Sequence, residues 1–98
     1  MRINVRKTLK RMNVCEGGQE RVVKQFGERA KLNRRNVEKA MKRWGIGWMK
    51  DFLCASLKDN TFRGVFERLS RKHQAKHQSD EYYPAFAKAL VKAYKKAK

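Results

Sequence analysis

The 98 residues of this chain are enough for one domain with a modest core and leave no room for a second, catalytic domain. Lys and Arg number 26 against 9 Asp and Glu, so the formal net charge at pH 7 is +17. Repulsion at this charge density destabilises the compact state unless a polyanion relieves it. A phosphate-bearing partner, and nucleic acid first of all, is therefore the expected ligand.

The positive charge is unevenly distributed along the chain. Residues 1–14 carry five positive and no negative charges, and residues 33–50 carry six positive charges against one negative. Residues 51–60 are slightly acidic, with one positive and two negative charges. Basic blocks separated by balanced ones predict that the cations gather on particular faces of the fold.

The sequence has no recognisable targeting signal. The basic segment 1–12 lacks the apolar run of a signal peptide, and no stretch reaches the length of a membrane span. Two cysteines, Cys15 and Cys54, fit a reducing compartment better than a disulfide scaffold. We therefore expect a cytoplasmic protein, associated with the nucleoid if it is bacterial, and no contact with a membrane.

Apolar residues recur at spacings of three and four in almost every segment, which predicts helices. A first helix is expected at about 4–12 and a second from about Gln19. The third helix has the clearest limits, with Asn33 as its N-cap and Gly45 as its stop signal. Its inner face combines apolar residues at i, i+3, i+4 and i+7, namely Val37, Ala40, Met41 and Trp44.

Three further helices are expected in the second half of the chain. A mostly buried helix follows Gly47, and a fifth fades near His77. The last helix has Pro84 in its first turn, the position that proline tolerates, and ends in a short basic tail at about 95–98. Alternation of apolar and polar residues never persists, so no strand is expected. The predicted fold class is all-α, a single domain over 1–98 built as a compact bundle of five or six short helices.

Residues 23–32 read VKQFGERAKL, and the next nine residues read NRRNVEKAM. This segment resembles the helix-turn-helix motif of small DNA-binding regulators. Gly27 stands where that motif needs a small residue at the crossing of its helices, and Leu32 stands where an apolar residue plugs the turn. The sequence departs from the motif at Lys31, where the turn usually has Gly in a left-handed conformation, and at Ala30, where a larger apolar residue is common. The resemblance predicts a helix-turn-helix within residues 19–44.

The resemblance implies that the third helix is a recognition helix whose outer residues face DNA. The residues at the matching positions are Asn33, Arg34, Arg35, Glu38, Lys39, Lys42 and Arg43. Arg34 and Arg35 are the candidates for reading bases, because the planar guanidinium can bond O6 and N7 of guanine together. The three cations that follow them would contact phosphates and fix the register without reading sequence.

Glu38 is the one acid of this set, and two roles are open to it. It can accept a hydrogen bond from a cytosine amino group, or it can pair with Lys42 four residues later, which the helical spacing favours. The whole set also has a plainer interpretation, in which the third helix simply presents a solvated cationic face.

Metal binding and catalysis have no support in the sequence. His73 and His77 have the spacing at which two imidazoles share a zinc ion on a helix, but Cys15 and Cys54 lie far apart and belong to no paired motif. No serine, cysteine or carboxylate has a neighbour that would activate it. We expect neither an enzyme nor a bound cofactor.

The sequence therefore predicts a DNA-binding protein, a helix-turn-helix transcriptional regulator or accessory factor of phage, plasmid or bacterial type. Duplex DNA is preferred over RNA as the partner, and a homodimer would allow symmetric half-sites to be read. Two alternatives stay open: an RNA-binding protein, and a basic inhibitor or adaptor that binds an acidic surface of a protein partner.

Overall fold

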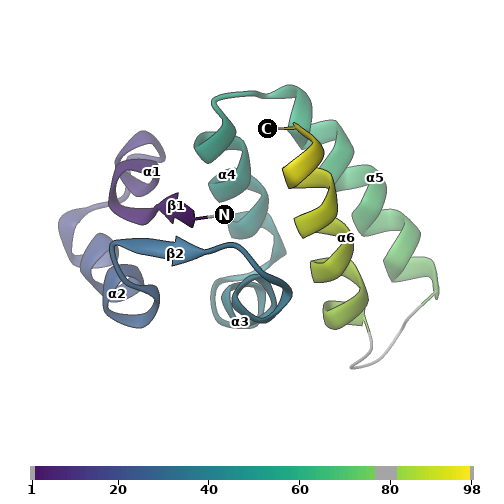
Figure 1. Cartoon of the computed structure of the whole chain (residues 1–98), viewed down its shortest axis with the longest axis horizontal. Coiled ribbons are helices and arrows are strands. Elements are labelled where there is room, and N and C mark those ends of the chain that lie inside the picture. The colour runs from purple at the N-terminus through teal and green to yellow at the C-terminus, as the bar shows by residue number, and fades with distance from the viewer. Residues whose placement is uncertain (1, 77–81, 98) are drawn as a thin grey trace.

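The computed structural model describes residues 2–76 and 82–97, which form six helices and one two-stranded sheet (Figure 1). The helices are α1 (Val5–Arg11), α2 (Glu16–Phe26), α3 (Arg34–Trp44), α4 (Ile46–Leu57), α5 (Thr61–Lys76) and α6 (Tyr82–Ala97). The strands are β1 (Arg2–Asn4) and β2 (Arg29–Lys31). The expected all-α bundle is confirmed, with a small sheet added to it.

The prediction that no strand occurs is wrong for these two short segments. β1 and β2 pair in antiparallel register, with Arg2 opposite Lys31 and Ile3 opposite Ala30. A strand of three residues has only one residue on its inner face, so its sequence cannot show an alternating pattern. The strands form because distant parts of the chain meet, and that pairing leaves no local signal.

The ends of α3 are set by local residues, as the sequence predicts. The Asn33 side chain accepts a 2.8 Å hydrogen bond from the backbone N–H of Asn36, which satisfies one of the free donors of the first turn. Gly45 ends the helix with φ near 101°, a conformation that glycine adopts without a steric penalty. Asn4 caps α1 in the same manner, accepting from the N–H of Lys7 at 3.0 Å.

The main core is enclosed by the last four helices. α4 and α6 each pack against both α3 and α5, while α1 packs at the side of this group against α2 and α4 (Figure 1). The largest fully buried side chains come from α5 and α6, and each is at most 2% exposed: Phe62, Phe66, Phe86 and Tyr94. The Tyr94 hydroxyl shares a 2.6 Å hydrogen bond with Ser56 of α4, which ties α6 to α4.

The connection between α2 and α3 differs from the predicted short turn. α2 begins at Glu16 rather than Gln19, and Gly27 ends this helix with φ near 88° instead of lying within it. β2 then occupies the middle of the connection. Lys31 is therefore in an extended strand and needs no left-handed conformation. These details correct the expectations drawn from the helix-turn-helix resemblance.

The C-terminal region also differs in detail. α6 continues through Ala97, so the predicted basic tail is the last turn of a helix as far as that residue. Pro84 lies in the first turn of α6, as expected. The predicted fading of α5 near His77 lies outside the described residues. Within the described ranges, no helix is both long and apolar enough to cross a membrane.

Candidate nucleic-acid interface

The inner face of α3 anchors this helix in the bundle. Val37, Ala40 and Met41 are each at most 5% exposed, and the helix packs between α4 and α6. Trp44 is only half-buried at the end of this stripe, where its ring lies 5.7 Å from that of Phe26 and 5.0 Å from that of Trp48. The predicted orientation of the helix is therefore confirmed, and its opposite face is turned outward.

The outer face of α3 is strongly cationic. The exposed cations on this face are Arg34, Arg35, Lys39, Lys42 and Arg43. With 3.6 residues per turn they cover one continuous half of the helix surface. Arg34, Arg35 and Lys39 form no ion pair with any carboxylate in the described part of the chain.

Three residues of the predicted set, Asn33, Glu38 and Lys42, are engaged within the protein. The Asn33 side chain is used as the N-cap of α3, where its oxygen accepts from the backbone N–H of Asn36. Glu38 forms an ion pair with Lys42, with Oε1 3.1 Å from Nζ, which is the second of the two roles considered for this acid. The pair removes part of the negative charge that Glu38 would otherwise present to a polyanion.

The last two cations of α3 also contact aromatic rings. The Lys42 ammonium lies 5.9 Å from the centre of the Tyr83 ring, and the Arg43 guanidinium lies 5.5 Å from that of Trp44. Such contacts orient a cation without neutralising it. The N-terminal half of α3, with Arg34, Arg35 and Lys39, thus has the cations with the fewest internal contacts.

A second group of cations lies on the outer face of the sheet. Arg2, Arg29 and Lys31 are exposed there, while Ile3 and Ala30 point inward. Arg2 and Lys31 are directly opposite one another, and like charges in this position are destabilising. Sequence reasoning missed this group because its members come from two distant segments.

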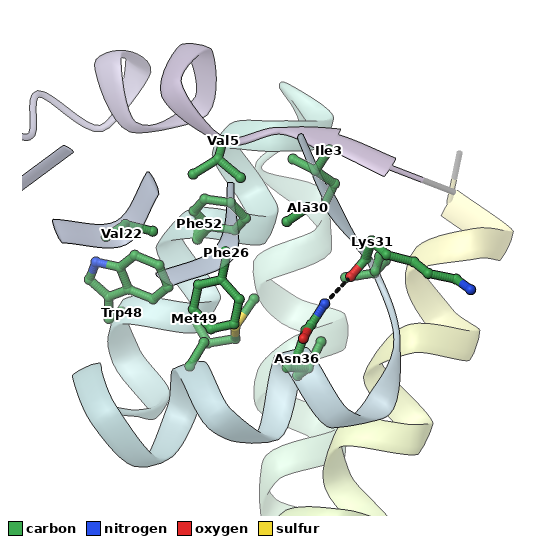
Figure 2. Close-up of a pocket in the computed structure, with 13 residues that line it drawn as sticks. Ile3, Val5, Val22, Phe26, Ala30, Lys31, Asn36, Trp48, Met49 and Phe52 are labelled. Atoms are coloured by element: carbon green, nitrogen blue, oxygen red, sulfur yellow. Dashed lines mark hydrogen bonds between the residues drawn. The ribbon is translucent and has the colours of Figure 1, made fainter. Parts of the chain in front are cut away.

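The sheet is fixed to the start of α3. The side-chain amide of Asn36 donates a 2.7 Å hydrogen bond to the backbone carbonyl of Lys31 (Figure 2). β2 also leads directly into the cap of α3 (Figure 1). The cations of the sheet are therefore held next to those of the first turns of α3, and we call the two groups together the α3–sheet surface.

An apolar cavity of about 40 Å³ lies beneath the sheet (Figure 2). Its walls include Ile3, Phe26, Ala30, Trp48 and Phe52, from β1, α2, β2 and α4. This volume is close to that of one or two water molecules, so the cavity is a packing gap rather than a cofactor site.

Two acids of the N-terminal region, Glu20 and Glu28, are paired with Arg6. Arg6 donates to both carboxylate oxygens of Glu28 at 2.9–3.1 Å and forms an ion pair with Glu20 at 2.9 Å. These bonds raise the pKa of Arg6, and the bond from Arg6 holds the pKa of Glu28 below its usual value. Arg6 is thus neutralised and does not contribute to a cationic surface.

The cysteines do not form a metal site with the described residues. Cys54 is buried, and burial raises the pKa of its thiol. Cys15 is exposed, and its sulfur accepts from the N–H of Gly18 at 3.4 Å as the cap of α2. No group of three potential metal ligands occurs among the residues that the structure describes.

Comparison with known proteins gives no relative on which to base a function. No family model matches this chain, and the searches of curated proteins and of solved structures find no match.

Proposed function

We propose that this protein binds duplex DNA through the α3–sheet surface, as a small regulator or accessory factor. The observation that carries the proposal is the outer face of α3, where five exposed cations are accompanied by one acid that is already paired. A helix fits the major groove, which is about 12 Å wide. The buried inner face would hold α3 rigidly while its outer face contacts the DNA.

The roles follow from the positions of the cations. Arg34 and Arg35 stand in the first turn of α3 and would reach base edges, since they have no internal partner among the described residues. Lys39 and the cations of the sheet would bind phosphates on either side. The helix-turn-helix resemblance stays a prediction, and the sheet in the connection between α2 and α3 is a departure from that motif.

The test compares two double variants by fluorescence anisotropy on a labelled duplex of about 20 base pairs at one salt concentration. Arg34→Ala with Arg35→Ala is expected to weaken binding at least about tenfold, because base or phosphate contacts in the groove are lost. The control, Arg21→Ala with Arg71→Ala, removes two exposed arginines from α2 and α5 and is expected to weaken it less than about threefold.

The same measurement distinguishes the alternatives. Equal losses of DNA affinity in the two double variants would contradict the assignment of α3 as the helix that contacts DNA. General electrostatic attraction would then explain the binding. Tighter binding to a structured RNA hairpin than to the duplex would favour the RNA-binding alternative.

A further inference from the structure

A groove between α5 and α6 forms a separate cationic surface. Arg68 and Lys72 of α5 and Lys92 and Lys96 of α6 line it, and all four are exposed. None of the described residues that line the groove is acidic, and none comes from α3. The groove is therefore distinct from the α3–sheet surface.

The four cations have no internal compensation within the described residues. None of them forms an ion pair there, although Arg63 and Lys50 on α5 and α4 do so with Asp51 and Glu67. On each helix the two cations are four residues apart, so they lie one above the other on adjacent turns and repel each other. The repulsion between these cations is thus unfavourable in the free protein, and a negatively charged ligand in the groove would relieve it.

The floor of the groove is apolar. Val65 and Leu69 of α5 and Ala89 and Ala93 of α6 line it and are only half-buried. The alanine side chains are small, so the backbone or side chains of a partner can come close to α6. A ligand that uses the whole groove must therefore have both an apolar stripe and negative charge beside it.

Two candidate occupants fit this surface poorly. A second copy of the chain would bring two sets of four cations together, which Coulomb repulsion opposes. Single-stranded nucleic acid uses exposed aromatic rings on which bases stack. Among the described residues that line the groove, Phe62 is the one aromatic residue, and it is 2% exposed. Phosphates alone would leave the apolar floor in water.

We propose that the α5–α6 groove binds an acidic amphipathic helix of a protein partner. The apolar stripe of such a helix would cover Val65 and Leu69, and its flanking carboxylates would pair with the cations on both rims. The surface is independent of the proposed DNA contact, so the protein would act as an adaptor that holds an acidic partner while α3 is bound to DNA.

The probe for this proposal is a fluorescein-labelled synthetic peptide of about 16 residues, long enough to cover the groove as a helix. It has Leu at i, i+3, i+4 and i+7 and Glu on both flanks. Binding is measured by anisotropy on the full chain at physiological ionic strength. Binding is expected to shift the NMR signals of the Val65 and Leu69 methyl groups. A peptide with Ser in place of each Leu is expected to bind at least about tenfold more weakly, because only the charge contact remains.

The matched variants reverse two charges each. Arg68→Glu with Lys92→Glu is expected to weaken peptide binding at least about tenfold, and Arg21→Glu with Lys10→Glu less than about threefold, since the latter pair lies on α2 and α1. Circular dichroism and thermal melting show whether each variant retains the fold.

Several results would overturn the proposal. No peptide binding at millimolar concentration would do so, as would equal weakening by the two double variants or undiminished binding of the Ser peptide. A deoxythymidine oligomer that shifts the same methyl signals and is weakened selectively by the groove variant would assign the groove to nucleic acid instead.

Discussion

The side-chain amide of Asn36 donates a hydrogen bond to the carbonyl of Lys31 and so joins β2 to the first turn of α3. This bond holds two groups of cations in one geometry. We expect Asn36→Ala to lower the free energy of unfolding by about 0.5–1.5 kcal/mol, the usual net contribution of one hydrogen bond. DNA affinity should fall as well, because the sheet is no longer fixed relative to α3.

Chemical denaturation and anisotropy measure the two effects. Asn36→Asp keeps the shape but places an acceptor against the carbonyl of Lys31, so it should destabilise the fold more than Asn36→Ala. Gln25→Ala, at an exposed position of α2, is the control and should change stability by less than about 0.5 kcal/mol. Unchanged stability in both Asn36 variants would show that the bond does not hold the sheet.

The salt dependence of DNA binding gives a second prediction. If four to eight phosphates are neutralised, log affinity should fall against log salt with a slope of roughly −4 to −7, following about −0.9 per contact. If Arg34 and Arg35 contact phosphates, Arg34→Ala with Arg35→Ala should flatten the slope. If they contact bases alone, the slope of this double variant should equal that of the wild type. A wild-type slope near zero would refute the nucleic-acid proposal.

The cavity beneath the sheet gives a third prediction. Ala30 is half-buried at its wall, so Ala30→Val should fill part of the space and raise the free energy of unfolding by about 0.5–1 kcal/mol. Ala30→Thr has nearly the same shape and a similar preference for strands, but its hydroxyl would enter an apolar space. Equal stabilisation by both substitutions in urea melts would mean that strand propensity, not filling of the cavity, is the cause.

The ion pair between Arg6 and Glu28 makes stability depend on pH. Because the pKa of Glu28 is lowered in the folded state, its contribution is present above the ordinary carboxyl pKa. It is lost as the pH falls from about 4.3 through the lowered pKa. Arg6→Gln should therefore be less stable than wild type at pH 7, with a gap that closes in acid. Both residues reach solvent, so the gap is small, and urea melts across this range measure it. A gap independent of pH would argue that Arg6 acts by packing alone.

Local signals in the sequence predicted α3 well. The Asn33 side chain caps the start of the helix, and the backbone of Gly45 ends it. The apolar stripe that begins at Val37 has the period of a helix. None of these signals depends on distant residues. The helix-turn-helix resemblance, in contrast, places Gly27 inside the first helix of the motif, whereas in the structure this glycine ends α2.

The tertiary part of the candidate site could not be predicted in this way. The position of Arg2 beside Lys31 depends on strand pairing. The capping role of Asn33 and the pair of Glu38 with Lys42, in contrast, follow from local spacing and agree with the prediction. Periodicity indicates which face of a helix is outward. It does not indicate which cations from distant segments join that face.

The pairing of β1 with β2 also has a consequence for the order of assembly. The two strands close a loop that contains α1 and α2, and loop closure costs entropy before the new contacts compensate for it. During synthesis β1 leaves the ribosome before β2 and has no partner in the sheet until Lys31 has followed it. α3 comes next along the chain, but its apolar inner face is not buried until α4 and α6 have been made. The face that we assign to DNA is therefore fixed in place only after the C-terminal helix has been made.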